Sequence, residues 1–160
     1  MRIEERLVRT LTARSLSLCT AESCTGGLIA GRITSVPGAS ACFEGGIVTY
    51  SNRAKTILLG VPAELIEHHG AVSEEVARAM AEGARERLGT DIAVAVTGIA
   101  GPAGGSPEKP VGTVFISLAA PGMTSARGFR FEGTRSEIRR RSGDEALNFV
   151  LDHLDGKVSE

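Results

Sequence analysis

A short polar turn near the start of the chain holds the side chains best suited to nucleophilic chemistry. Ser23, Cys24 and Thr25 stand between an apolar run typical of a strand and one typical of the first turns of a helix. Gly26 and Gly27 follow, and glycines let another group approach the backbone closely. Because N–H groups at the start of a helix have no partner within it, they can hold an anion or a developing oxyanion. Ser23 or Thr25 could instead serve only as the helix cap.

The second candidate is a lysine in a chain that uses few of them. Lys55 is one of three lysines among eighteen basic residues. Arginine keeps its proton near neutral pH, whereas a desolvated lysine can lose it and act as a base. Lys55 follows an apolar strand, and Ile57 and Leu58 could exclude water from it. If Lys55 meets Ser23, it would take the hydroxyl proton during attack on a carbonyl and return it to the leaving amine. Tyr50 could relay that proton or fix the lysine; a plain surface lysine is the alternative.

Other catalytic arrangements have weaker support in the sequence. Cys24 could be a nucleophile beside Ser23, but no histidine lies near it in the sequence. His68 and His69 could serve a serine, although adjacent histidines at the end of a surface helix are usually solvated. The Gly-x-Ser-x-Gly pattern of hydrolase elbows is absent around Ser23. Neither the histidines nor the acidic residues have the spacing of a metal site, so we expect no metal and no cofactor.

A long loop rich in glycine and proline covers residues 97–110 and directly follows a continuously apolar run. Such a long loop inside a compact domain often has a role in binding. It lacks the Gly-Lys-Ser/Thr ending of a phosphate-binding Walker loop. A flexible connector is the alternative interpretation.

The composition predicts one globular domain over residues 1–160. Apolar residues make up 42% of the chain and charged residues 23%, and the net charge of -1 argues against a nucleic-acid partner. The odd number of cysteines, without metal-ligand spacing, indicates reduced thiols and a cytoplasmic protein. No signal peptide or membrane span is expected. A small, glycine-rich chain with an aliphatic core could also self-associate.

Alternating strand and helix patterns predict an α/β fold. The continuous apolar run 92–96 is typical of a strand covered on both faces. Ser51, Ser73 and Thr134 are expected to cap helices. Strands are expected at 16–19, 43–50, 92–96, 111–119 and 125–131, and helices from 3, from 28, at 53–59 and 63–69, after Ser73 and after Thr134.

Four sequence stretches together are typical of one known family. They are Ala-Glu-Ser-Cys-Thr-Gly-Gly at 21–27, Thr-Tyr-Ser-Asn followed by Lys55 at 49–55, His-Gly-Ala-Val-Ser at 69–73 and Val-Thr-Gly-Ile-Ala-Gly-Pro at 96–102. Through them, over residues 5–154, the chain resembles the CinA C-terminal domain family of nicotinamide mononucleotide amidases. The resemblance implies a single-domain α/β sandwich, with a mixed sheet and helices packed on it.

The same resemblance implies an activity and a set of site residues. The expected reaction converts the carboxamide of nicotinamide mononucleotide to nicotinate mononucleotide and ammonia, with Ser23 as nucleophile, Lys55 as its base and Tyr50 assisting. Either Arg135 or Arg139 would bind the phosphate, and we favour Arg139. The other substrate-binding residues implied are Cys24, Thr25, Gly26, Thr97, Gly98 and Gly101.

A protein of another class remains the alternative. The pocket of the family could persist without turnover in a module that binds a nucleotide or a protein partner. Two residues differ from those usual in the family, namely Ala103 and Thr134. Both lie in segments expected to bind substrate, so they bear on the substrate more than on the Ser23–Lys55 pair.

Overall fold

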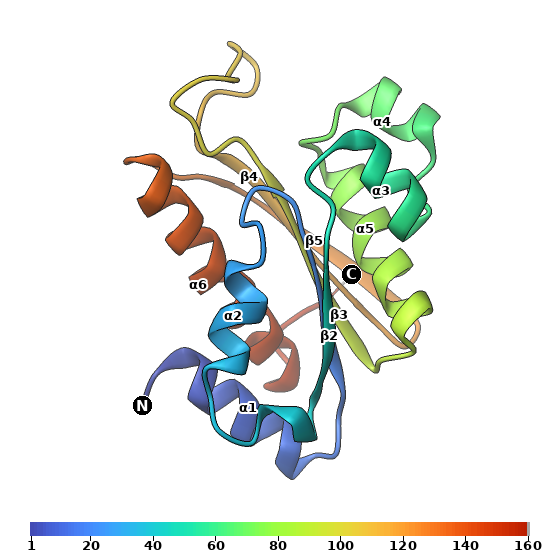
Figure 1. Cartoon of the computed structure of the whole chain (residues 1–160), viewed down its shortest axis with the longest axis vertical. Helices are drawn as coiled ribbons and strands as arrows, with labels where there is room; N and C mark the ends of the chain where they lie inside the picture. Colours follow the sequence, from blue (N-terminus) through green and yellow to red (C-terminus); the bar gives the residue numbers. More distant parts are fainter. Residues whose placement is uncertain (160) are drawn as a thin grey trace.

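A computed structural model describes residues 1–159 as a five-stranded mixed sheet with helices on both faces (Figure 1). The strand order is β2-β1-β3-β4-β5, in which β2, β1 and β3 run parallel and β4 and β5 are antiparallel to their neighbours. The predicted α/β fold with a mixed sheet is confirmed. The strands are β1 (Leu18–Glu22), β2 (Phe43–Val48), β3 (Ile92–Gly98), β4 (Thr113–Ala120) and β5 (Met123–Arg130).

Helices form a layer on each side of the sheet, as Figure 1 shows. One layer contains α1 (Ile3–Ala13), α2 (Leu28–Thr34) and α6 (Arg135–Leu154), and the other contains α3 (Asn52–Leu59), α4 (Ala63–His69) and α5 (Glu74–Leu88). A 3-10 helix (Ala39–Ala41) precedes β2. None of the helices within residues 1–159 is long and apolar enough to cross a membrane.

Side-chain alternation along the central strand β3 divides the core into two clusters. Val94 and Val96 face the α1, α2 and α6 layer, whereas Ala93 and Ala95 face the α3, α4 and α5 layer. The small alanines allow α5 to lie close to the sheet. Gly83 extends this close packing, since a Cβ there would collide with the Leu59 carbonyl oxygen at the end of α3. The helix that carries Lys55 is thereby held against α5.

The three parallel strands end at one edge of the sheet. Glu22, the last residue of β1, pairs with Val48 of β2 on one side and with Val96 of β3 on the other. The residues that follow or end these strands, namely Ser23, Thr49 and Thr97, therefore meet at this edge. Loops at the carboxyl ends of parallel strands are the usual position of a binding site in α/β proteins.

Most of the predicted elements are present, and their boundaries shift by a few residues. Ser51, Ser73 and Thr134 each accept a backbone N–H as expected of helix caps. The first strand extends to Glu22 rather than ending at Cys19. Its polar residues are fully buried, which hydrophobic periodicity does not anticipate.

Candidate active site

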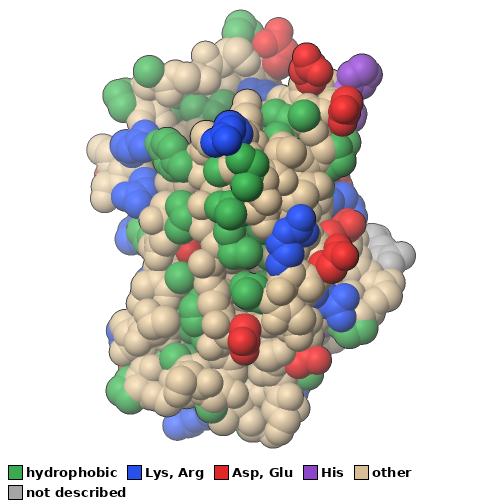
Figure 2. Space-filling view, turned by 45° about the vertical axis from the view of Figure 1, so that its right-hand side comes forward, with side chains coloured by type: hydrophobic (Ala, Val, Ile, Leu, Met, Phe, Trp, Pro, Cys, Tyr) green, Lys and Arg blue, Asp and Glu red, His purple; other side chains and the backbone are tan. Residues whose placement is uncertain are grey.

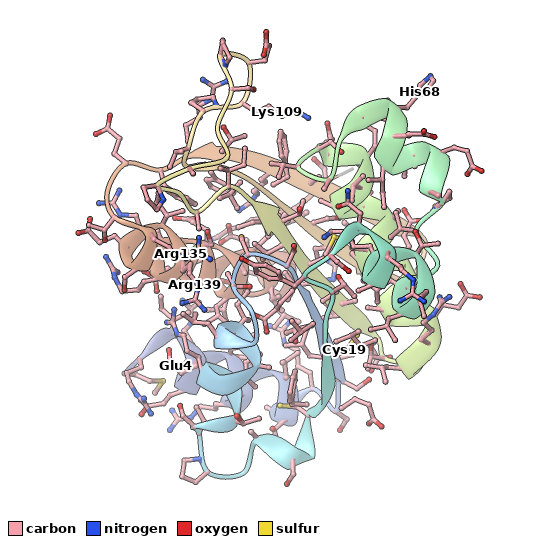
Figure 3. The ribbon with its side chains drawn as sticks, turned by 45° about the horizontal axis from the view of Figure 1, so that its top comes forward. Glu4, Cys19, His68, Lys109, Arg135 and Arg139 are labelled. Atoms are coloured by element: carbon pink, nitrogen blue, oxygen red, sulfur yellow. The ribbon has the colours of Figure 1, made fainter. Side chains whose placement is uncertain are left out.

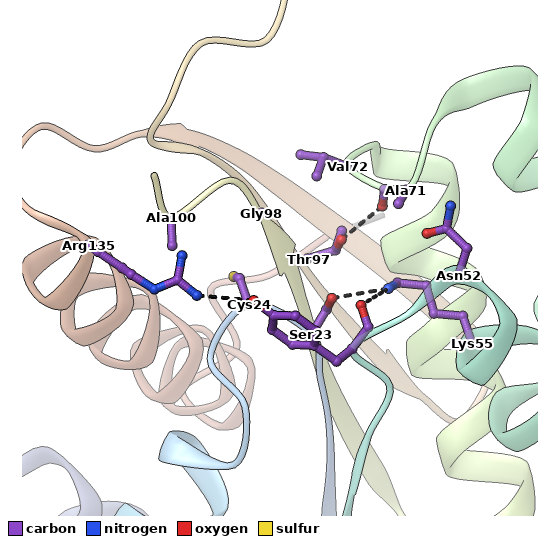
Figure 4. Close-up of a pocket in the computed structure, with 11 residues that line it drawn as sticks. Ser23, Cys24, Asn52, Lys55, Ala71, Val72, Thr97, Gly98, Ala100 and Arg135 are labelled. Carbon is purple, nitrogen blue, oxygen red and sulfur yellow. Dashed lines mark hydrogen bonds between the residues drawn. The ribbon is translucent and has the colours of Figure 1, made fainter. Parts of the chain in front are cut away.

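A pocket of about 220 Å³ lies at the carboxyl ends of β1 and β3 (Figure 4). Its walls are formed by the ends of β1 and β3, by the loop after β3, by the β2–α3 and α4–α5 connections and by the starts of α3 and α6. Most of these segments carry motifs singled out in the sequence. The lining residues are Ser23, Cys24, Tyr50, Asn52, Lys55, Ala71, Val72, Thr97, Gly98, Ala100 and Arg135.

Ser23 and Lys55 are hydrogen-bonded partners at the base of this pocket. The Lys55 Nζ lies 3.0 Å from Ser23 Oγ, and Figure 4 draws this contact. Lys55 is only 1% exposed although it is charged in its usual state. Its Nζ also lies 3.0 Å from the Thr49 carbonyl oxygen and 3.5 Å from that of Tyr50. Backbone carbonyls, rather than a carboxylate, therefore surround the amine.

Burial lowers the pKa of Lys55 below the ordinary lysine value, because the ammonium form loses its hydration. A neutral amine has two N–H donors and one lone pair. The donors match backbone carbonyls such as that of Thr49, and the lone pair can accept the Ser23 hydroxyl proton. The arrangement is that of a serine nucleophile beside its general base.

Glu22 fixes the turn that presents Ser23. Its buried carboxylate accepts hydrogen bonds from the N–H groups of Gly27 at 3.2 Å, Ile29 at 2.9 Å and Ala30 at 3.0 Å. A residue of the preceding strand thus supplies the acceptor for N–H groups at the start of α2, which have no partner within the helix. The alternative in which Ser23 or Thr25 caps this helix is wrong, because the N-cap is Gly27 and makes no side-chain cap bond.

The N–H groups of the turn itself differ in availability. Gly26 N–H donates to the Ser23 carbonyl oxygen at 3.0 Å and is thus occupied. Within residues 1–159, the N–H groups of Cys24 and Thr25 have no acceptor. Cys24 directly follows Ser23 and lines the pocket, and Thr25 is the next residue of the turn, so these are the free backbone donors closest in sequence to the nucleophile.

The two candidate arginines of α6 have different environments (Figure 3). Arg139 donates through Nε to the Cys24 carbonyl oxygen at 3.1 Å and through Nη2 to that of Thr25 at 2.9 Å. Arg139 does not line the pocket. Through these two hydrogen bonds it stabilises the turn that carries Ser23. Arg135 does line the pocket. The structure thus places Arg135, and not the expected Arg139, at the wall of the pocket.

Tyr50 and Arg135 meet across the pocket. Arg135 donates through Nη1 to the Gly101 carbonyl oxygen at 2.8 Å and through Nη2 to Tyr50 Oη at 3.0 Å. Tyr50 is 63% exposed, and its hydroxyl does not contact Lys55, so the expected proton relay has no direct path. Only its backbone carbonyl faces the lysine. Across residues 1–159, Arg135 has no acidic partner.

The end of β3 forms another wall of the pocket, because this strand continues to Gly98 and the loop expected from residue 97 begins after it. Thr97 Oγ1 donates to the Ala71 carbonyl oxygen at 2.8 Å and so connects the end of β3 to the α4–α5 connection. Gly98 leaves no room for a side chain, because a Cβ would lie 2.7 Å from Val114 and 3.2 Å from Cys24 Sγ. Gly101 contributes the carbonyl that holds Arg135 rather than a surface of the pocket.

The alternative nucleophiles fit the geometry less well. Burial raises the pKa of the Cys24 thiol to about 11, so it remains protonated near neutral pH. His68 and His69 end α4 and do not line the pocket; His69 lies 3.4 Å from Glu75. Figure 2 shows histidine side chains on an outer edge of the molecule beside acidic ones. Residues 1–159 contain no cluster of three side chains that could hold a metal ion.

Sequence reasoning did not single out three lining residues, Asn52, Ala71 and Val72. All three belong to the stretches that carry the family resemblance, which was the available signal. Their side chains have no reactive chemistry of their own, so only the folded structure shows that they line the pocket.

Comparison with known proteins identifies close relatives. The sequence model of the CinA C-terminal domain matches residues 1–154. A CinA-like protein of Citrifermentans bemidjiense is 55% identical over 152 residues, covering 95% of this chain and 37% of that protein. One from Geotalea daltonii is 61% identical over 143 residues, covering 89% of this chain and 34% of that protein. The chain thus spans little more than a third of these curated relatives.

Solved structures show the same fold. The crystal structure of the competence/damage inducible protein CihA from Agrobacterium tumefaciens aligns with a TM-score of 0.90 at 43% identity, covering 97% of both chains. A competence-damaged protein (CinA) superfamily structure from Klebsiella pneumoniae aligns with a TM-score of 0.93 at 35% identity, covering 96% of both chains.

Proposed function

Because the chain belongs to the CinA C-terminal domain family, we propose that it is a cofactor-independent amidase. In this proposal it hydrolyses the carboxamide of nicotinamide mononucleotide to nicotinate mononucleotide and ammonia. The observation that carries the proposal is the 3.0 Å contact between Lys55 Nζ and Ser23 Oγ inside a pocket. The three buried, unpaired cysteines further favour a reducing compartment, and we assign the protein to the cytoplasm.

The first half-reaction transfers the acyl group to Ser23. Neutral Lys55 accepts the hydroxyl proton as Ser23 Oγ attacks the carboxamide carbon, and the carbonyl oxygen becomes an oxyanion. The C–N bond then breaks, and the Lys55 ammonium returns the proton to the leaving nitrogen, which departs as ammonia. Ser23 is left as an ester of the nicotinate group.

The second half-reaction releases the acid. Neutral Lys55 takes a proton from a water molecule as the water oxygen attacks the ester carbon. The bond to Ser23 Oγ breaks, and Lys55 gives the proton back to that oxygen. The product carboxylic acid loses its own proton to solvent, and the enzyme regains its starting state.

The oxyanion would be stabilised by the N–H groups of Cys24 and Thr25. Cys24 directly follows the nucleophile, Thr25 is the next residue of the same turn, and neither N–H group has an acceptor within residues 1–159. Preorganised backbone donors of this kind contribute strongly to acyl-transfer catalysis. Glu22 and Arg139 would act through them, because they hold the turn that carries these donors.

The phosphate would be bound by Arg135, which lines the pocket without an acidic partner within residues 1–159. We expect Arg135→Gln to raise KM for nicotinamide mononucleotide by about ten- to a hundredfold, since a hydrogen bond to a charged group contributes roughly 1.5–3 kcal/mol. Steady-state kinetics with the mononucleotide and with nicotinamide riboside measure the effect. Arg140→Gln, on the exposed face of α6, is the matched control.

The riboside makes this prediction specific. Because it lacks the phosphate, its kcat/KM should be the same in the wild type and Arg135→Gln. An equal decrease of kcat/KM for both substrates would contradict phosphate binding by Arg135. Arg135 would then serve to maintain the shape of the pocket.

Ammonia release tests the proposed function directly. Purified protein, with chelator present, is expected to release ammonia and nicotinate mononucleotide in equal amounts from nicotinamide mononucleotide. Thermal stabilisation by the nucleotide without ammonia release would contradict the amidase and favour the binding module. The positions of Ala103 and Thr134 would then be the first to compare with active relatives.

A further inference from the structure

Asn52 occupies a position in the pocket that no step of the proposed reaction uses. It is the first residue of α3 and precedes Lys55 by three positions, so the two side chains share one face of the helix. Both line the pocket. Figure 4 draws the Asn52 amide beside Lys55, on the side of the pocket closed by Ala71 and Val72.

The structure gives this amide no task in folding. Asparagine at a helix start commonly caps the helix, but here Ser51 does so, because its Oγ accepts the Ala54 N–H at 3.0 Å. In the part of the chain that the structure describes, the Asn52 side chain makes no hydrogen bond. The amide is therefore free to bind a ligand that enters the pocket.

The other polar groups of the pocket are mainly donors or are already engaged. Lys55 and Arg135 donate, as do the N–H groups next to Ser23. The Thr49 carbonyl oxygen accepts from Lys55, and that of Ala71 accepts from Thr97. A carboxamide brings two N–H donors of its own, and a buried donor left without an acceptor costs free energy.

Resting on the proposed amidase function, we propose that Asn52 Oδ1 accepts an N–H of the substrate carboxamide and makes the pocket selective for primary amides over esters. With the carbonyl oxygen on the Cys24 and Thr25 donors, this bond directs the amide nitrogen toward the α3 side of the pocket. Lys55 lies on that side and must protonate the nitrogen as it leaves. Asn52 thus binds the leaving group and orients it.

Two substrates that differ only in the leaving group test this role. Nicotinamide mononucleotide carries N–H donors, whereas the methyl ester of nicotinate mononucleotide has none at that position. Asn52→Leu is expected to lower kcat/KM for the amide about tenfold, because one hydrogen bond is lost, and to change that for the ester less than twofold. Arg53→Gln, on the same turn of α3 but outside the pocket, should change neither value.

Asn52→Asp keeps an acceptor at this position and provides a second test. It should retain more activity on the amide than Asn52→Leu when the two are compared at high pH, where Lys55 is neutral despite the new neighbouring charge. Unchanged thermal unfolding midpoints would show that the variants are folded.

The outcomes separate this inference from the function on which it rests. If Asn52→Leu lowers kcat/KM equally for the amide and the ester, or keeps wild-type activity on the amide, the role of Asn52 is overturned and the amidase proposal is not. A wild type that releases neither ammonia nor methanol would overturn the amidase proposal, and the role of Asn52 with it.

Discussion

Replacing Lys55 with methionine is expected to lower kcat/KM for ammonia release by about 10³-fold, a typical contribution of general acid–base catalysis. Methionine keeps the buried apolar stem but has no nitrogen to accept the Ser23 proton. The Thr49 carbonyl loses its donor, while the cost of burying an amine disappears, so the protein should remain folded. Steady-state kinetics and a thermal unfolding scan of the same preparation measure the two effects.

Lys55→Arg is the informative companion. Arginine keeps a positive charge but cannot act as a base, so this variant should be as inactive as Lys55→Met. In the wild type, kcat/KM should rise with pH, because the protonated lysine has no lone pair. Burial lowers the pKa of Lys55, so this rise should be centred below the ordinary lysine value. Substantial activity in either variant would contradict the role of Lys55 as base.

Replacing Glu22 with leucine is expected to reduce the free energy of unfolding by about 3–5 kcal/mol, the range for breaking a buried charged interaction. The three N–H groups at the start of α2 would lose their acceptor, and leucine would offer none. The turn at Ser23 would lose its anchor, so amidase activity should fall as well. Urea unfolding curves measure the stability, and ammonia release measures the activity.

A surface glutamate supplies the control for Glu22. Glu44 is exposed on edge strand β2, and Glu44→Gln should change the free energy of unfolding by less than about 0.5 kcal/mol. Glu22→Gln, which keeps one carbonyl oxygen, should fall between the wild type and Glu22→Leu. Wild-type stability in Glu22→Leu would contradict its role as the cap of α2.

The proximity of Ser23 and Lys55 could be predicted from the sequence for a physical reason. Ser23 directly follows β1, and Lys55 lies in the first turn of α3, the helix that follows the parallel neighbour β2. Parallel neighbours end at the same edge of a sheet, so residues in the turns after them are brought together. The lysine also stands out because the chain otherwise uses arginine.

The roles of the two arginines could not be assigned in this way. Arg135 and Arg139 are four residues apart and share one face of α6, so their spacing does not distinguish them. Only the tertiary structure distinguishes their roles. Arg139 donates hydrogen bonds to the Cys24 and Thr25 carbonyl oxygens, whereas Arg135 donates to Tyr50 Oη and to the Gly101 carbonyl oxygen.

Glu22 escaped prediction because it lies on the strand before the turn it stabilises. Capping patterns are sought at the N-cap and three residues later, and here the N-cap is Gly27. A polar residue at the end of an apolar strand instead suggested that the strand stops earlier. Its burial is explained only by the N–H groups of α2, which the fold brings over it.

Mass spectrometry of Ser23 during turnover tests the central claim most directly. Acid-quenched reactions with nicotinamide mononucleotide or the methyl ester should add the acyl group to the peptide that contains Ser23, and Ser23→Ala should carry no adduct and release no ammonia. An active wild type whose adduct lies on Cys24, or a Ser23→Ala variant that still turns over, would contradict the account of Ser23 as the nucleophile.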